Sequence, residues 1–139
     1  MRAAVLVLAA ALLLGGCGGE DTESGGTLRL LVLDGNLRQL GDPCNGAGPF
    51  DYAHADAGYV IEDGDGAEVF RGELPNGTAE KIMDVDFRAG LRQPTMCAMT
   101  LHVNGFTKTE GLELIIGHQA GIPIETSEKP GVVGEVTVS

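Results

Sequence analysis

The sequence is poor in residues that several common functions require. It has no Trp, two Tyr and four Phe, and nine basic residues against 20 acidic ones in a chain of 139. A net charge of −11 argues against a nucleic-acid partner, because binding the phosphate backbone requires Lys and Arg that displace counterions. The low aromatic content also argues against a sugar-binding surface, since such surfaces often use aromatic faces. The length allows one modest domain and not two.

Residues for nucleophilic catalysis are equally scarce. The three serines are Ser24, Ser127 and Ser139. A serine hydrolase needs a Ser held beside a general base. Here one Ser lies in a Gly-rich acidic segment, one in a polar loop and one at the last position. The sequence therefore predicts no catalytic residues and a protein that is not an enzyme.

The chain also lacks a hydrophobic run long enough to span a membrane. Ala3–Leu14 is apolar throughout, but a spanning helix needs about 20 residues. One Arg followed by a short apolar run is the layout of a secretory signal peptide. Leu14-Gly15-Gly16-Cys17 follows and resembles the lipobox of bacterial lipoproteins. An ordinary secretory signal with a chance Cys is the alternative.

The lipobox resemblance implies an anchor and a location. It implies cleavage after residue 16 and lipidation of Cys17. Two or more acyl chains hold a protein stably on a membrane, where one chain would be marginal. We therefore expect residues 1–16 to be a signal peptide and the mature protein to be anchored at the extracytoplasmic face of the cell membrane. Removal of Arg2 takes the formal side-chain charge from −11 to −12.

A short polar segment follows the expected lipidation site. Gly18–Gly26 reads GGEDTESGG, and small and acidic residues without apolar ones cannot bury enough surface to fold. Residues 17–26 are therefore expected to be a flexible tether. Fully extended, nine residues reach about 30 Å.

From Thr27 onward, strand-like runs alternate with Gly-rich turns. The Asp63-Gly64-Asp65-Gly66 segment predicts a hairpin, because Gly supplies the positive φ of a tight turn. Residues 27–139 are thus predicted to form an all-β, antiparallel sandwich with immunoglobulin-like or transthyretin-like topology. The predicted strands are Thr27–Leu33, Gly58–Glu62, Glu68–Leu74, Lys81–Arg88, Met96–Val103, Glu110–Gly117, Ile122–Thr126 and Val132–Val138.

Alternation within three of these runs predicts which side chains face the core. The inward faces are expected to be Met83, Val85 and Phe87; Cys97, Met99, Leu101 and Val103; and Leu112, Leu114 and Ile116. Asn76-Gly77-Thr78 fits a glycosylation acceptor, but the signal is bacterial in type, so we interpret it as a turn.

Two cysteines remain once Cys17 is assigned to lipid. In an exported domain, Cys44 and Cys97 are expected to form a disulfide. It would close a loop of about 54 residues, for which the chain-entropy model gives about 4 kcal/mol of stabilisation. Free or metal-binding thiols are the alternative.

The sequence offers partial matches to two kinds of metal site. The order of His54, Cys97 and His102 faintly resembles that of the ligands in blue-copper domains. However, no Met follows His102, and Cys97 is expected to be bonded to Cys44 in a disulfide. A soft ion such as copper could instead use Met96, Met99 and His102. His102 is predicted to face away from Cys97 because an odd separation places them on opposite faces of a strand.

Acidic residues are concentrated between Gln39 and Phe70, where no Lys or Arg occurs. Calcium takes six to eight oxygen ligands, and carboxylates on loops supply them. The alternative metal site would use Asp56, Asp63 and Asp65, while turn formation and solubility are the simpler interpretation. This acidic segment is the candidate functional surface; its acids are Asp42, Asp51, Asp56, Glu62, Asp63, Asp65 and Glu68.

The strand-turn-strand segment carries a further resemblance. Gly58-Tyr59-Val60, Asp63-Gly64-Asp65-Gly66, Val69, Gly72 and Leu74 together are similar to transthyretin-like or carboxypeptidase-regulatory-like β-sandwiches. With Cys44-Asn45-Gly46 upstream, the domain resembles small lipoproteins of high-GC Gram-positive bacteria. The resemblance implies a fold and a location, with no catalytic residues and no cofactor. We expect a lipid-anchored, non-catalytic envelope module that binds an envelope partner, with calcium or copper handling as the alternative.

Overall fold

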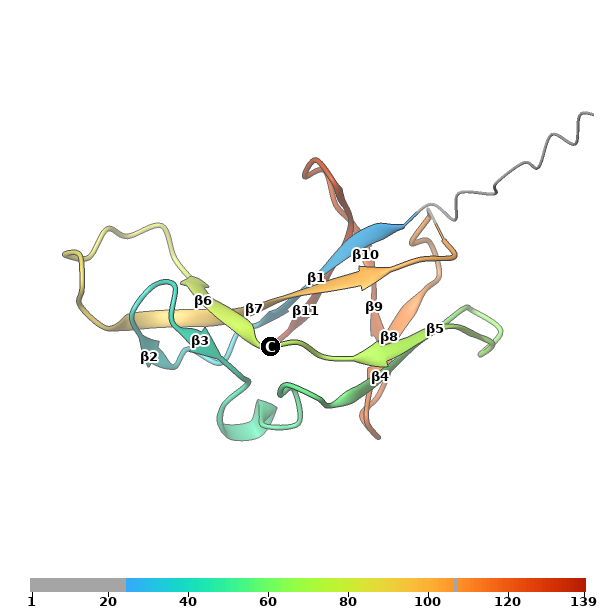
Figure 1. Cartoon of the computed structure of the whole chain (residues 1–139), viewed down its shortest axis with the longest axis horizontal. Helices are drawn as coiled ribbons and strands as arrows, with labels where there is room; N and C mark the ends of the chain where they lie inside the picture. Colours follow the sequence, from blue (N-terminus) through green and yellow to red (C-terminus); the bar gives the residue numbers. More distant parts are fainter. Residues whose placement is uncertain (1–24, 107) are drawn as a thin grey trace, which may run out of the picture.

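The computed structural model describes residues 25–106 and 108–139, and these form an almost entirely β structure (Figure 1). The signal peptide, Cys17 and all but the last two residues of the expected tether lie outside the described residues. No helix of the described part is long and apolar enough to cross a membrane. The elements are β1 (Gly26–Val32), β2 (Leu37–Arg38), β3 (Pro43–Cys44), the 3-10 helix η1 (Gly48–Phe50), β4 (Gly58–Glu62), β5 (Glu68–Glu73), β6 (Gly77–Lys81), β7 (Gln93–Val103), β8 (Glu113–Ile116), β9 (Ile122–Pro123), β10 (Glu125–Thr126) and β11 (Val132–Val138).

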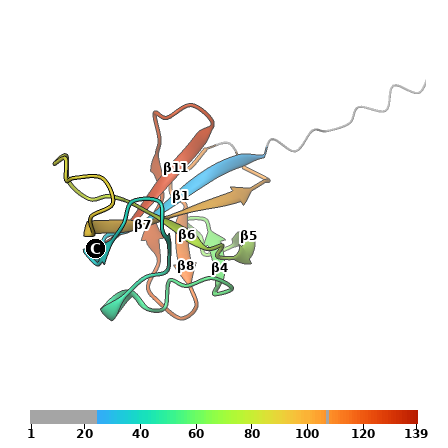
Figure 2. The same cartoon turned by 60° about the vertical axis from the view of Figure 1, so that its left-hand side comes forward.

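The strands form two sheets. The larger has the order β10-β11-β1-β7-β6-β3, with β2 paired to one end of β7, and the smaller has the order β5-β4-β8-β9. β7 organises the larger sheet because its 11 residues pair with β1, β6 and β2 along its length. Figure 2 shows β1, β7 and β11 crossing above β4, β5 and β8.

The larger sheet is mixed and not purely antiparallel, so the antiparallel prediction was wrong at its centre. β1 pairs antiparallel with β7 but parallel with β11, with Leu30 opposite Val136. Periodicity reveals which side chains face inward but not the direction of a neighbouring strand. The smaller sheet is antiparallel, as predicted.

One hydrophobic core lies between the sheets. The larger sheet contributes alternate residues of β1, β7 and β11, and the smaller contributes Tyr59, Ile61, Leu114 and Ile116. The predicted inward faces of the 96–103 and 110–117 runs are confirmed, since Met99, Leu101, Val103, Leu112, Leu114 and Ile116 are all buried. The hairpin between β4 and β5 is also confirmed, and Gly66 adopts φ +77° in its turn.

The predicted strand over 122–126 is two short strands in different sheets. β9 pairs with β8 in the smaller sheet, and β10 pairs with β11 in the larger. Ile124 lies between them, is buried, and donates its backbone N–H to the carbonyl of Leu112 at 2.9 Å. This crossing ties the two sheets together through the backbone.

The predicted strand over Lys81–Arg88 was wrong. β6 ends at Lys81, and residues 82–92 form a loop before β7. Met83, Val85 and Phe87, which were expected to face the core, are 46 %, 47 % and 41 % exposed. The Asn-Gly-Thr turn was also misplaced, because Gly77 is the first residue of β6. The strands β2, β3 and β6 were not predicted from the sequence.

Candidate functional site

Cys44 and Cys97 form a disulfide, as the sequence predicted, and both cysteines are buried in the core. Cys44 ends β3 and Cys97 lies in β7, while Gly77 of β6 lies opposite Cys44. A Cβ on residue 77 would lie 2.4 Å from Sγ of Cys97 and 3.1 Å from Sγ of Cys44. Residue 77 must therefore be Gly for the bridge to occupy this position.

A buried ion pair fixes the segment that leads to Cys44. The Arg38 guanidinium donates to both carboxylate oxygens of Asp34, at 2.9 and 2.6 Å, and the Asp34 side chain is fully buried. Arg38 also donates to the hydroxyl of Thr95 on β7 and to the carbonyl of Asn45. Thr95 in turn donates through its hydroxyl to the carbonyl of Asn36. The network connects β2, β7 and the residue after Cys44.

These contacts shift the ionisation of Asp34. Burial alone disfavours its carboxylate, but hydrogen bonds from Arg38 and from the backbone N–H of Asn36, with the charge of Arg38, outweigh burial. The net effect lowers the pKa of Asp34 from its ordinary value of 3.8. The ion pair thus serves structure, since every described contact of Asp34 and Arg38 is internal.

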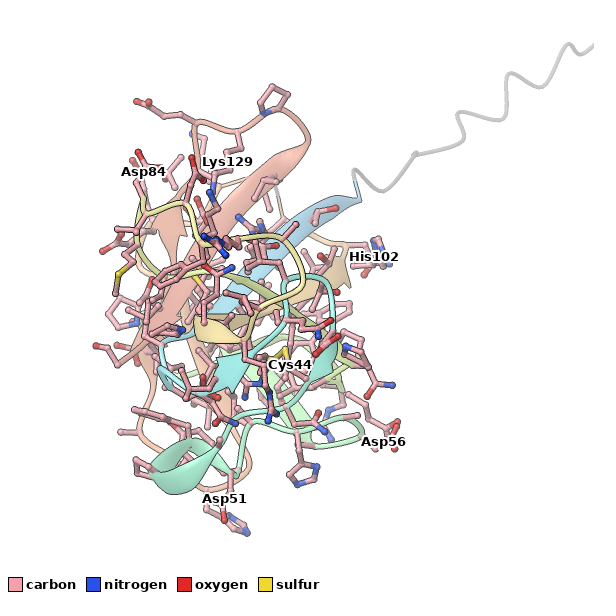
Figure 3. The ribbon with its side chains drawn as sticks, turned by 90° about the vertical axis from the view of Figure 1, so that its left-hand side faces the viewer. Cys44, Asp51, Asp56, Asp84, His102 and Lys129 are labelled. Carbon is pink, nitrogen blue, oxygen red and sulfur yellow. A yellow bond between two sulfur atoms is a disulfide. The ribbon has the colours of Figure 1, made fainter. Side chains whose placement is uncertain are left out.

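The acidic segment between residues 39 and 70 does not converge on one point. Asp42 precedes β3, Asp51 follows η1, Asp56 precedes β4, and Asp63 and Asp65 lie in the β4–β5 turn. Figure 3 shows Asp51 and Asp56 at separate positions on the periphery. Within residues 25–106 and 108–139, no three His, Cys, Asp or Glu side chains come together as a metal site.

Two of the three candidate calcium ligands, Asp63 and Asp56, have structural roles in turns. Oδ1 of Asp63 accepts the backbone N–H groups of Asp65 and Ala67, each at 2.9 Å, and so closes the β4–β5 turn. Asp56 adopts φ +66° and donates its own N–H to the carbonyl of Leu74. The structure supports turn formation at both positions and does not bring Asp56 into a metal site with Asp63 and Asp65.

The residues considered for copper are separated in a similar way. Cys97 is a disulfide cysteine and offers no thiolate. Met99 is fully buried, whereas His102 is exposed on the opposite face of β7, as predicted. The described residues therefore do not form the soft-metal site that was the alternative from sequence.

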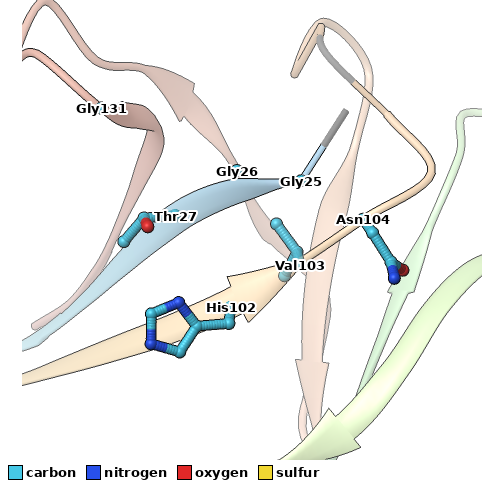
Figure 4. A pocket seen from close by; sticks show the side chains of 7 residues that line it. All are labelled: Gly25, Gly26, Thr27, His102, Val103, Asn104 and Gly131. Atoms are coloured by element: carbon cyan, nitrogen blue, oxygen red, sulfur yellow. The ribbon is translucent and has the colours of Figure 1, made fainter. Parts of the chain in front are cut away.

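A surface depression of about 470 Å³ lies where β1 begins and β7 ends. Figure 4 shows Thr27 and His102 close together on adjacent strands at this site, and the two residues are register partners. His102 is the one ionisable side chain among its described lining residues, which otherwise are Gly25, Gly26, Thr27, Val103, Asn104 and Gly131.

Exposed apolar side chains gather at the other end of β7. Every large hydrophobic residue that is strongly exposed in the described part of the chain falls in residues 37–40 or 83–91. We call residues 36–40 and 82–92 together the apolar tip. Its exposed apolar members are Leu37, Leu40, Met83, Val85, Phe87 and Leu91, between 41 % and 54 % exposed.

The two segments of the apolar tip meet beside the start of β7. Leu37 pairs with Pro94 in the β2–β7 ladder, and Leu37 is exposed while the neighbouring Arg38 is buried. Leu40, Phe87 and Leu91 line a shared hollow of about 270 Å³. In Figure 1 the loop between β6 and β7 projects at the end of the molecule opposite the start of β1.

Sequence reasoning missed this surface because alternation alone cannot separate a strand from an extended loop. In the structure, β2 also reverses the usual order, since its apolar residue is exposed and its Arg is buried. Searches against protein-family models, curated proteins and solved structures found no match for this chain.

Proposed function

We propose that this protein is a non-catalytic binding module of the bacterial cell envelope, exported and held on the membrane through lipid at Cys17. The buried disulfide between Cys44 and Cys97 carries the proposal. Such disulfides form and persist in oxidising compartments outside the cytoplasm. The Leu14-Gly15-Gly16-Cys17 motif supplies the means of export and attachment.

The fold supports a module that displays a binding surface. Two sheets around one core are consistent with a β-sandwich, for which the transthyretin-like and immunoglobulin-like topologies were expected. The distinctive surface of the described residues is the apolar tip, and contiguous exposed apolar residues commonly mark interaction sites.

The anchor is tested by comparing the protein with its Cys17→Ser variant in the native host. We expect the parent to partition into detergent and membranes and to carry acyl chains by mass spectrometry. The variant should lose both properties, while its Cys44–Cys97 disulfide remains. A variant that still partitions with the membrane would refute lipid anchoring at Cys17.

A further inference from the structure

We propose that the apolar tip is the docking surface for a partner protein that presents an apolar surface bordered by carboxylates. The proposal depends on the proposed function only for the direction in which the tip points. Its apolar content is concentrated in a way that the rest of the described surface does not repeat. Monomeric soluble proteins rarely leave such a cluster uncovered unless it binds something.

The tip is held in place by structure beneath it. Arg38, which follows Leu37 in β2, is buried and donates hydrogen bonds to Asp34, Thr95 and the carbonyl of Asn45. On the surface of the tip, a hollow is lined by the apolar residues Leu40, Phe87 and Leu91 and by the polar residues Gln39, Arg88 and Gln93. An apolar hollow edged by polar groups is the usual composition of an interface core with its rim.

Charge favours a carboxylate-bearing partner. Lys81 pairs with Asp86 on the loop, whereas Arg88 and Arg92, which flank Leu91, form no ion pair with any described residue. Asp84 is the remaining acid of the loop. In a chain with a net charge of −11, two free guanidinium groups beside the exposed apolar residues point to acidic groups on the partner.

Geometry and charge disfavour the other occupants. β7 runs from Gln93 at the tip to Val103 beside Gly26, so about 33 Å separates the tip from the point where the chain leads toward Cys17. The tip therefore lies at the end of the domain farthest from the attachment point, and a lipid occupant is an outcome of the crosslinking test below. In a symmetric contact, Arg88 and Arg92 would face whichever side chains lie across the two-fold axis. The tip offers one acid that is not already in an ion pair with a described residue, Asp84, so a second copy does not supply carboxylates for both guanidinium groups.

The occupant is tested by photo-crosslinking in intact cells of the native host. A photoreactive phenylalanine derivative replaces Phe87 in the full chain, and in a control it replaces the exposed His102. We expect position 87 to give an adduct with one identified protein and position 102 to give none with that protein. A lipid adduct alone, an adduct with a second copy, or no adduct would overturn the proposal. Fractionation of the same cells reports separately whether the Cys17 anchor is present.

The identified protein is then purified and its binding to the full chain is measured. The exposed positions allow Phe87→Ser with Leu91→Ser without disturbing the core, and this variant should bind about 30-fold more weakly. Arg88→Glu with Arg92→Glu should weaken binding at least about tenfold at low salt, whereas the matched reversal Arg71→Glu with Lys108→Glu should not. Binding that is unchanged by both tip variants would overturn the proposal.

Discussion

At the scale of single residues, one glycine and one ion pair decide how the core accommodates its covalent and polar features. Gly77 leaves space for the disulfide, and Asp34 with Arg38 places a full ion pair inside the protein. Neither could be identified from sequence. Gly77 looked like a turn residue after Asn76, and the roles of Asp34 and Arg38 depend on Thr95, far away in the chain.

The first residue prediction concerns Gly77→Ala. A Cβ at this position collides with both sulfur atoms, so the substitution should destabilise the protein by about 1–3 kcal/mol in urea unfolding. Gly58→Ala is a matched control, because a Cβ there meets no atom within 4 Å. Equal stability of the two variants would show that the bridge does not depend on the space at residue 77.

The second concerns Arg38→Ala, which leaves the Asp34 carboxylate buried without its partner. Removing one member of a buried pair costs about 3–5 kcal/mol. The control Arg71→Ala breaks the exposed pair with Glu68 and should have a much smaller effect. Thermal unfolding of both variants at neutral pH measures the difference, and a small loss for Arg38→Ala would contradict a structural role for the pair.

The third residue prediction concerns how the stability of the folded protein depends on pH. Because folding lowers the pKa of Asp34, its ionised form stabilises the folded protein at pH values above 3.8. That stabilisation is lost as pH falls through the lower, folded pKa. Asp34→Asn should therefore be less stable than the parent at pH 7 and lose less stability between pH 4 and pH 2. Parallel stability curves for the two proteins in that range would contradict it.

At the scale of elements, the disulfide connects β3 to β7 across β6, the strand that lies between them in the larger sheet. β3 has two residues and pairs only through Pro43 and Cys44 with β6. So short a strand contributes little by itself, and the bridge with the Arg38 network holds this end of the sheet together.

The corresponding prediction is for the variant that combines Cys44→Ala with Cys97→Ala. Opening a covalent loop with a sequence separation of 53 should lower the free energy of unfolding by about 4 kcal/mol, as should reduction of the parent. Cys17→Ser is the control, since it should retain the bridge and the parent's sensitivity to reductant. Equal unfolding midpoints with and without reductant would mean that the bridge contributes nothing.

Sequence prediction was accurate where alternation coincided with a buried face. β4 and β11 match their predicted bounds, and β1, β5 and the second half of β7 lie close to theirs. Sequence prediction failed for residues 81–88, where alternating apolar residues lie in a loop. It also failed for the two-residue strands, because they are too short to show a period. The parallel β1–β11 pairing depends on the whole fold and has no local signal.

At the scale of the whole molecule, the anchor side and the binding side are expected at opposite ends of β7. The depression beside Gly26 lies at one end, and the apolar tip lies at the other. The acidic segment, which was the candidate surface from sequence, is spread over several turns between them. The candidate site therefore moved from the acids to the apolar tip, three of whose side chains, Met83, Val85 and Phe87, had been expected in the core.

This arrangement predicts the pattern of limited trypsin digestion. Arg88 and Arg92 are exposed in a loop without strand pairing, so cleavage should occur there first. The two fragments remain joined by Cys44–Cys97, so they should separate on a gel only after reduction. First cleavage at Arg71 within β5 would contradict the exposed-loop assignment, and cleavage at Arg29 is not expected because β1 is central in its sheet.

The parallel pairing of β1 with β11 has a consequence for export. β1 is the first strand to be made, yet both of its neighbours, β7 and β11, come from the second half of the chain. Pairing across such long separations is slow, because a large loop must close before contacts form. The central sheet therefore cannot be completed until residues 132–138 have been synthesised. If the chain is exported as proposed above, this sheet would be completed only after residues 132–138 have also crossed the membrane, where the cysteines can be oxidised.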